Sequence, residues 1–474
     1  MKGNKHNNGD CISHGQVAES TLPEGWSSSA LRNLLQYRKG KKPRRLEKTD
    51  WGGAVPYIDI EAFEMGRIRK YADPDSSVIV EGGDVVVVWD GARCGYAGKA
   101  PARGALGSTL MALKSTSVHG GYLLRFLQML YATVNSNPRG TGIPHVDPEV
   151  FWNLEMPIAA FEEQKRIVAK IEELLPRVNA VRERLIRVKE IMRRFRQSVL
   201  SAACSGRVTE DWRDIYSSNN EGEELLKSIL SIRPARLRDN ISRDSHQPRR
   251  PDGDQVREVP NGWALASLDQ LSCLVTSGSR GWAKHYSNGG PLFIRAQNIN
   301  KDVLCLDDVA HVSPPLSAEG RRTCVRLGDI LITITGANVT KSALVKGDIG
   351  EAYVSQHVSL VRPVDTMTGP FMYLWIISPV HGRAKLTDDA YGAGKPGLNL
   401  ENIKEMTIAL PGPAEQKEIV SSVEKLFDLA DMIEKRVETE LSRTDKMTKA
   451  ILAKAFRGEL VSTVADLDRR KGEI

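Results

Sequence analysis

Residues 161–168, FEEQKRIV, return as PAEQKEIV at residues 413–420. The two stretches lie 252 residues apart, and the same offset holds without a gap on both sides. It pairs Gly140 with Gly392, Gly142 with Gly394, Pro144 with Pro396, Leu174 with Leu426, Leu200 with Leu452 and Gly206 with Gly458. Self-similarity at a fixed period indicates a duplicated unit, and 474 residues are too many for one core. The sequence therefore predicts two related halves.

The repeat continues more weakly toward the start of each half. LPEGW at 22–26 corresponds to VPNGW at 259–263, and VEGGDVVVVWDGA at 80–92 corresponds to VRLGDILITITGA at 325–337. β-Branched runs between glycine-rich turns are typical of strands. We expect an α+β fold with an internal pseudo-two-fold repeat, made of β-rich domains at 21–156 and 259–410 and long helices at 157–208 and 411–462.

Three further segments have polar compositions. Residues 209–258 are rich in charge, Ser, Asn and Pro, which is typical of a linker between the halves. Residues 1–20 are polar enough that we expect disorder there. Residues 463–474 remain as a C-terminal tail.

The two long helices carry a narrow apolar stripe in steps of four and three residues. Sustained over four heptads, this stripe indicates a coiled coil, whereas packing of an amphipathic helix on a globular core is the alternative. Pro176 inside the first helix is expected to bend it one turn upstream. The predicted helix-pairing residues are Ile167, Ile171, Leu174, Val178, Val181, Leu185 and Val188, with Ile419, Val423, Leu426, Ile433 and Val437 in the second copy.

Two such helices most simply pair with each other, and antiparallel pairing suits a globular domain before each. Forty residues at about 1.5 Å each would make a spacer of roughly 60 Å, compared with about 34–36 Å per turn of B-DNA. The span 165–196 holds eleven Lys or Arg against four Glu, and the span 417–448 holds six against eight acids. Solvated faces, ion pairs between the helices and a track for DNA phosphates all fit this charge pattern.

The stretch YGAGKPGLNL at 391–400 contains G-x-G-x-x-G, the spacing of a dinucleotide-binding loop. Pro396 cannot lead smoothly into a helix at Gly397, and Lys395 is followed by proline, which excludes a P-loop. The matching stretch RGTGIPHV at 139–146 has no third glycine. The shared pattern is G-x-G-x-P, which we interpret as a tight junction between domain and helix.

Composition narrows the class of protein. The mean hydropathy is −0.32 and the pI is about 9.0, with a net charge of +7. The N-terminus lacks the apolar core of a signal peptide, and the six cysteines show no C-x-x-C pair, as expected of reduced thiols in a cytoplasmic, prokaryotic protein. A polyanionic partner is compatible with this charge.

These motifs together resemble the specificity (S) subunit of Type I restriction–modification enzymes. The resemblance covers about residues 20–462 and rests on the duplicated P-x-G-W openings, the duplicated E-Q-K-x-I-V helix starts and the closing AFRGEL. It implies a non-catalytic reader of double-stranded DNA, whose β-rich domains each recognise half of a bipartite asymmetric target. It further implies that the paired helices set the gap and dock two methyltransferase subunits, with restriction/translocase subunits joining them. S-adenosylmethionine, ATP and magnesium would serve those partners.

Residue chemistry supplies the candidates for DNA contact, because Arg, Lys, Asn and Gln in glycine-rich loops can reach bases or phosphates. Solubilising surface charge is the alternative for the basic run at 37–45. His119, His145 and His357 are interpreted as structural histidines. The DNA-binding candidates are Lys41, Lys42, Arg44, Arg45, Arg93 and Lys99 in the first half, and Arg280, Lys284, Arg295, Gln297, Asn298, Asn338, Lys341 and Lys395 in the second.

Three other functions stay open at this point. The chain would be a protein-interaction scaffold if DNA were irrelevant to it, and a nucleotide-dependent enzyme if the 392–397 loop bound phosphate. It would also serve a methyltransferase without restriction if no restriction subunit joined the assembly. We found no N/D-P-P-Y/F motif of an adenine methylase, no Walker A motif and no H-E-x-x-H motif in the sequence.

Overall fold

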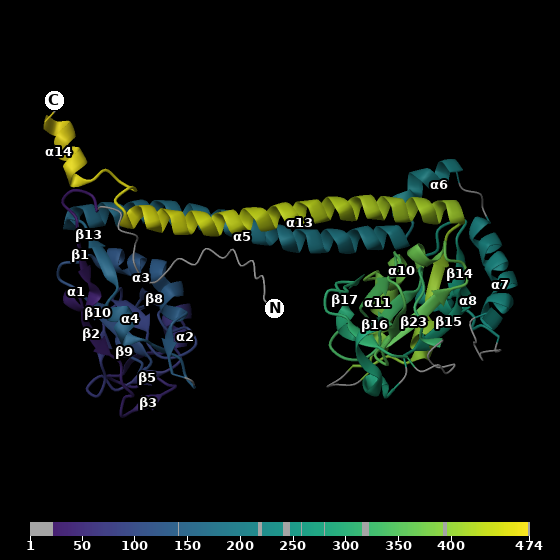
Figure 1. Cartoon of the computed structure of the whole chain (residues 1–474), viewed down its shortest axis with the longest axis horizontal. Helices are drawn as coiled ribbons and strands as arrows, with labels where there is room; N and C mark the ends of the chain where they lie inside the picture. The colour runs from purple at the N-terminus through teal and green to yellow at the C-terminus, as the bar shows by residue number, and fades with distance from the viewer. Residues whose placement is uncertain are drawn as a thin grey trace, which may run out of the picture. The chain divides into compact units, whose positions relative to one another are not determined.

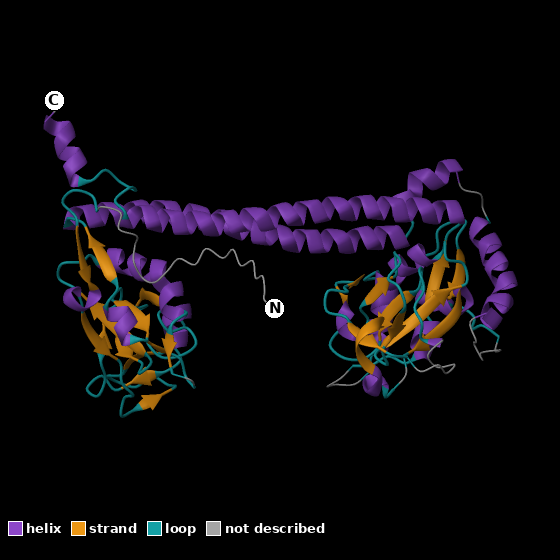
Figure 2. Ribbon diagram, viewed as in Figure 1, coloured by secondary structure: helices purple, strands orange, loops and turns teal. Residues whose placement is uncertain are grey.

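The computed structural model describes residues 22–472 apart from 141, 217–219, 240–246, 257, 279, 315–321 and 392–395. It divides into two compact units, one formed by Met1–Ile186 with Glu438–Ile474 and the other by Arg187–Val437. Figures 1 and 2 show a group of strands and short helices in each unit. Among the described residues, no helix combines the length and the apolar character that crossing a membrane requires.

The first unit contains two larger sheets and two separate strand pairs. The four-stranded sheet has the order β2-β10-β7-β8 and the five-stranded sheet the order β3-β5-β4-β9-β6, while β1 pairs with β13 and β11 with β12. The strands are β1 (Ser27–Ala30), β2 (Gln36–Lys39), β3 (Leu46–Glu47), β4 (Val55–Ile58), β5 (Tyr71–Ala72), β6 (Ile79–Val80), β7 (Val85–Val88), β8 (Ala97–Lys99), β9 (Gly104–Leu106), β10 (Leu110–Lys114), β11 (Pro138–Arg139), β12 (His145–Val146) and β13 (Glu155–Ile158). The helices are α1 (Leu31–Leu34), α2 (Ile60–Met65), α3 (Gly120–Asn135) and α4 (Pro148–Trp152).

The second unit repeats this plan. Its four-stranded sheet has the order β15-β23-β20-β21, a three-stranded sheet has the order β19-β16-β22, and β14 pairs with β24 and β17 with β18. The strands are β14 (Ala264–Ser267), β15 (Ser272–Ser277), β16 (Tyr286–Ile294), β17 (Ile299–Asn300), β18 (Val303–Leu304), β19 (Ala310–Val312), β20 (Ile330–Thr333), β21 (Ser342–Leu344), β22 (Ala352–Val354), β23 (Val358–Pro363) and β24 (Thr407–Leu410). The helices are α8 (Leu268–Leu271), α10 (Gly369–Ile377), α11 (Gly382–Asp389) and α12 (Leu400–Lys404).

The two units share the plan of their four-stranded sheets and of the pairs β1–β13 and β14–β24, which confirms the predicted α+β repeat. Each contains one parallel pair, β4 with β9 and β16 with β22, in an otherwise antiparallel arrangement. The G-D turns that begin β7 and β20 are also built alike. Asp84 accepts from the Glu81 N–H at 2.9 Å, and Asp329 accepts from the Arg326 N–H at 2.7 Å.

Two long helices take part in both units, α5 (Phe161–Cys204) and α13 (Pro413–Phe456). In the first unit the start of α5 and the end of α13 enter one core, and in the second unit the end of α5 and the start of α13 enter another. The pairing is therefore antiparallel. Interhelical ion pairs join Arg182 to Asp445 at 3.3 Å and Arg196 to Glu434 at 2.7 Å. Part of the charge contrast between the helices is thus used to pair them.

Most predicted helix-pairing residues are inside. Ile167, Ile171, Val178, Ile419, Val423 and Val437 are buried, and Leu174, Leu185, Val188, Leu426 and Ile433 are partly buried. Val181 is wrong as a pairing residue, because its side chain is 46% exposed. Pro176 lies within α5 without ending it.

The motifs that mark the repeat hold each domain to its helix. Trp26 of LPEGW donates to Glu163 at 3.0 Å, and Trp263 of VPNGW donates to Glu415 at 2.8 Å. Both carboxylates are about 1% exposed. Glu163 and Glu415 are the glutamates of the two E-Q-K motifs, so these motifs form structural clamps.

The glycines after the long helices complete the clamps. Gly206 and Gly458 both have positive φ, and a Cβ there would lie 2.8 Å from Pro260 and 2.4 Å from Pro23. A side chain at either position would collide with the P-x-G-W motif of that unit. Close approach of backbone to a neighbouring ring therefore requires glycine here.

The segment 209–258, which we predict to be a charged linker between the halves, has helical structure of its own. It contains α6 (Glu210–Tyr216) and α7 (Glu221–Asp239). Ile229 of α7 is buried in the core of the second unit, and Arg233 pairs with Asp269 at 3.2 Å. The sequence did not indicate this helix, because the charged residues on its solvated face give the segment the composition of a linker. The tail is also helical, with α14 at Val464–Gly472, whereas residues 1–20 lie outside the described range.

The G-x-G-x-P motif closes onto the loop that follows the central strand of each domain. Pro144 accepts from the Gly91 N–H at 2.8 Å, and Pro396 accepts from the Gly336 N–H at 3.2 Å. Gly91 and Gly336 both have positive φ. These contacts lie within each β-rich domain, and the predicted junction between domain and helix stays a prediction. Gly392 and Gly394 lie outside the described part of the chain.

Candidate nucleic-acid interface

The second unit has a pocket of about 280 Å³ at the end of β16 and the start of the β22–β23 loop. Aromatic side chains form much of its wall. The rings of Trp282 and Phe293 are stacked with centroids 5.8 Å apart, and the ring of Tyr286 meets that of Phe293 edge-on at 5.5 Å. Trp282 and Phe293 are buried while Tyr286 is 48% exposed. The sequence analysis missed all three, although their spacing around SGSRGWAKHY was a usable signal.

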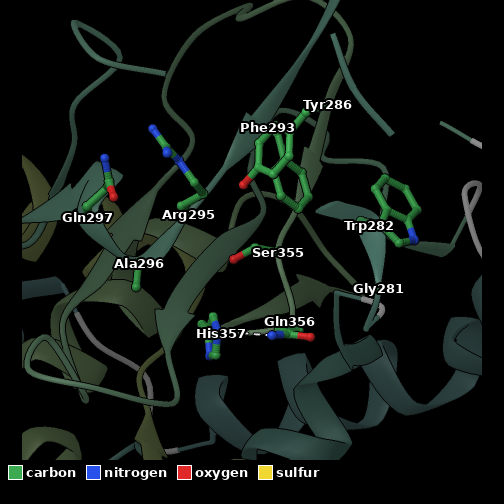
Figure 3. A pocket seen from close by; sticks show the side chains of 10 residues that line it. All are labelled: Gly281, Trp282, Tyr286, Phe293, Arg295, Ala296, Gln297, Ser355, Gln356 and His357. Carbon is green, nitrogen blue, oxygen red and sulfur yellow. Dashed lines mark hydrogen bonds between the residues drawn. The ribbon is translucent and has the colours of Figure 1, made fainter. Parts of the chain in front are cut away.

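Polar side chains complete the pocket (Figure 3). Arg295 donates through Nη2 to the Asp308 carbonyl at 3.2 Å, and Gln297 donates to the Asp308 carboxylate at 3.2 Å. On another side of the pocket, the Gln356 amide nitrogen lies 3.1 Å from Nε2 of the His357 ring. The predicted candidates Arg295 and Gln297 are thus brought together, and His357, which we interpret as a structural histidine, lies in the same pocket lining.

The segment around Trp282 carries two exposed cations. Arg280 and Lys284 are exposed next to Trp282, and within the described part of the chain neither forms an ion pair. Beneath Trp282, burial raises the pKa of the Tyr353 phenol, which donates to Glu351 at 2.5 Å. Tyr353 therefore stays neutral and adds no negative charge near the pocket.

Two candidates of the second unit have structural roles instead. Asn298 is 2% exposed, and its amide nitrogen donates to the carbonyls of Cys305 at 3.1 Å and Asp308 at 3.0 Å. Asn338 donates to the carbonyls of Ala296 at 3.2 Å and Ile299 at 3.3 Å. We correct both, because their amide nitrogens hold the Arg295 loop in place. Lys341 is partly exposed, and Lys395 lies outside the described residues.

In the first unit, the basic run at 37–45 contains both cations without an ion-pair partner among the described residues and cations, such as Arg45, that have partners. Lys41, Lys42 and Arg44 are exposed, and among the described residues their side chains form no ion pair. Arg45 pairs with Glu47 at 2.7 Å and lies over the Trp51 ring at 4.2 Å. The first three side chains are therefore the better placed to meet phosphates.

Arg93 and Lys99 differ in the same way. Arg93 forms an ion pair with Glu64 and lies 4.3 Å over the Tyr96 ring. Lys99 is exposed at the end of the edge strand β8. Lys99 is available to a ligand, whereas Arg93 would have to leave two partners.

A charged group missed by the sequence analysis lies at the first G-x-P junction. Asp90 is 17% exposed and accepts from Lys39 at 3.0 Å and contacts His145 Nδ1 at 2.7 Å. Arg139 is exposed and lies opposite His145 in the short β11–β12 ladder. His145 was expected to be an unremarkable structural residue. Its ring contacts the Asp90 carboxylate beside Lys39 and Arg139.

These two surfaces suit polyanion binding more than catalysis. They combine exposed cations with aromatic rings and amide groups, which are the groups that contact phosphates and bases. Across the residues that the structure describes, no three His, Cys, Asp or Glu side chains gather where they could hold a metal ion.

Comparison with known proteins gives a family match. Residues 23–189 and 287–443 match the family model described as the Type I restriction modification DNA specificity domain. The chain is 30% identical over 450 residues to the specificity subunit of the Type I restriction enzyme MjaVIII from Methanocaldococcus jannaschii, covering 93% of this chain and 94% of that relative. It is 29% identical over 339 residues to the EcoBI specificity subunit of Escherichia coli, covering 70% of this chain and 64% of that one, less than two thirds of its length.

A solved structure shares the fold. It is a chain from work described as the structural basis underlying complex assembly and conformational transition of the type I R-M system. The TM-score is 0.61 at 19% sequence identity, and the alignment covers 92% of this chain and 99% of that one. At this identity, the likeness shows the fold alone.

Proposed function

Because the chain belongs to the family of the Type I restriction modification DNA specificity domain, we propose that it is the DNA-recognition subunit of a restriction–modification assembly. Each β-rich domain reads one half of a bipartite, asymmetric target in double-stranded DNA. The observation that carries this proposal is the duplicated domain whose two copies differ in the side chains they expose. Related folds with different polar groups suit two different half-sites.

The second domain reads bases from the loop that holds Arg295 and Gln297. Arginine forms paired hydrogen bonds with guanine, and glutamine forms them with adenine. Asn298 and Asn338 fix the backbone of this loop from below. The first domain contacts DNA phosphates through Lys41, Lys42 and Arg44. The surface that holds Asp90 and His145 also faces the DNA.

The chain itself supplies recognition and assembly, and partners supply catalysis. Two methyltransferase subunits dock on the paired helices α5 and α13, and restriction/translocase subunits join that core. S-adenosylmethionine, ATP and magnesium are used by those subunits. The buried Glu163 and Glu415 clamps support this division, because the acidic groups of the repeated motifs are committed to the fold.

Replacing Arg295 by alanine is expected to weaken binding to the second half-site by about 1–3 kcal/mol, or about 5- to 150-fold. The loss follows from the missing base contact, so scrambling the second half-site should make the variant and the parent equal. Binding would be measured on target duplexes with one half or the other scrambled. An equal loss on every duplex, with a smaller salt dependence, would identify Arg295 as a phosphate contact instead.

Replacing Lys41, Lys42 and Arg44 together by alanine is expected to weaken binding to all duplexes alike. Each lost phosphate contact should lower the slope of log K against log salt by about 0.9, so the slope should fall by about 3. A matched control is the Arg69, Arg103 and Lys227 triple alanine variant, because these cations already pair with Glu61, Glu81 and Glu223. An unchanged slope in the loop variant would exclude phosphate contact by this loop.

A further inference from the structure

We propose that the pocket of the second domain receives one nucleobase that has left the DNA stack. This inference rests on the proposed function and adds the way in which one base is read. The occupant is a single base of the half-site, an aromatic ring with hydrogen-bonding edges. It enters a recess in the protein instead of presenting its edge in a groove.

Two buried polar atoms in the pocket wall have no partner. The Ser355 hydroxyl and the Arg295 Nε are both inaccessible and form no hydrogen bond, and Ser355 as a residue is 4% exposed. Leaving such groups unpaired costs free energy unless a ligand satisfies them. In Figure 3, Ser355 lies between Arg295 on one side and Gln356 on the other. A donor from Arg295 and a hydroxyl from Ser355 suit the acceptors of a base.

The size and wall of the pocket suit a base. Its volume of about 280 Å³ is near the low end of ligand pockets, at about 300–1,000 Å³. Trp282, Phe293 and Tyr286 supply ring faces and edges for stacking, which typically contributes about 1–3 kcal/mol per base. Base-edge reading in a groove needs none of these buried rings.

The surroundings explain how a base would reach the pocket. Tyr286 is 48% exposed at the rim, where its ring can meet a base that is leaving the stack. Arg280 and Lys284 lie beside the buried Trp282 and are exposed, so they can hold the phosphates that flank an extruded nucleotide. Gln297, Gln356 and His357 remain at the rim for its edges.

The test is a mismatch scan of the second half-site. The full chain is assembled with its methyltransferase subunits, and the base opposite each position is changed in turn while the base on the read strand is kept. An extruded base is easier to unpair from a mismatch, so one mismatch should tighten binding by about tenfold or more. A base read in the groove should instead lose affinity or stay unchanged.

Two variants separate this pocket from other base-extruding sites. Methyltransferases also extrude their target base, so that position should tighten in every variant. Ala296→Leu narrows the pocket, and Ser355→Ala removes the hydroxyl. Both should abolish or reduce the tightening at the base that enters the pocket, and leave the tightening at the methylated base unchanged. Ala235→Leu makes the same change at an exposed position of α7 in the same unit and should leave the tightening intact.

The outcomes are distinct. A tightened position outside the methylated base that is lost in Ala296→Leu supports the pocket. The inference is overturned if the intact chain shows no such position, and also if the tightening is unchanged in both pocket variants. Failure to bind the matched target specifically would instead contradict the proposed function itself.

Discussion

Replacing Arg362 by methionine is expected to lower the free energy of unfolding of the second unit by about 3–5 kcal/mol. Arg362 donates through Nε and Nη2 to both carboxylate oxygens of Asp329, at 2.8 and 2.6 Å. Both residues are buried, with Asp329 only 1% exposed. Without Arg362, the carboxylate would remain in the core without its cation, which costs more than the lost pair contributes.

The loss should depend on pH. Burial raises the pKa of the Asp329 carboxyl even though Arg362 opposes this shift, so removing Arg362 should raise the pKa further. A carboxyl with a raised pKa in the folded state stabilises the fold below its unfolded value of about 3.9, and this contribution is lost as the pH rises. The variant should therefore be less destabilised at pH 5 than at pH 8.

The first unit supplies the control for this variant. Lys114 stands at the corresponding place in β10, one residue past the last partner of β7, and is exposed. Lys114→Met should change the unfolding free energy by less than about 0.5 kcal/mol. Denaturant unfolding followed by hydrogen exchange would assign the loss to a unit. A loss from Arg362→Met as small as that of the control would contradict the account of a buried charge.

Replacing Phe456 by alanine is expected to destabilise the first unit by about 3–5 kcal/mol. Phe456 is the last residue of α13 and is 1% exposed. Its ring lies 4.8 Å from that of Tyr122 and 5.3 Å from that of Phe126, both on α3. The substitution would leave a cavity where the end of the second long helix packs on the first β-rich domain.

Phe161→Ala is the matched control, because Phe161 begins α5 in the same unit and is 43% exposed. Hydrogen exchange should show faster opening of α3 in Phe456→Ala and little change in the control. If both variants opened α3 equally, Phe456 would not be a main contact between the helix and the domain.

Much of the fold follows from features that duplication makes visible. A single P-x-G-W motif predicts no particular structure. Its second occurrence, again followed by an E-Q-K motif, predicts two related domains and two related helices. The duplication could not predict the contact between the two motifs, because Trp26 and Glu163 are 137 residues apart in the chain. Packing partners far apart in the chain leave no local periodicity.

The errors have local causes. Charge and proline concealed α7, because a helix with a wide solvated face resembles a linker in composition. Val181 fits the heptad, yet 46% of its surface is exposed. A heptad pattern is read from the sequence of one helix, whereas the burial of its residues also depends on the side chains of the partner helix.

The candidate site was only partly predictable for the same reason. Residue type and loop position identified Arg295 and Gln297, which do line one pocket. The same criteria selected Asn298, whose amide is used by the backbone. Whether a polar side chain turns inward or outward is decided by hydrogen bonds that residue type does not encode. Sequence also missed the aromatic wall, which comes from three separate positions.

The most direct test of the central claim is enrichment from a pool of random duplexes. The full chain with its methyltransferase subunits would be mixed with the pool, and bound duplexes sequenced. The account predicts two enriched blocks of different sequence separated by a gap of fixed length, with the second block relaxed in Arg295→Ala. A single uninterrupted enriched block, or no enrichment by a folded and assembled complex, would contradict the claim that the two domains read two half-sites.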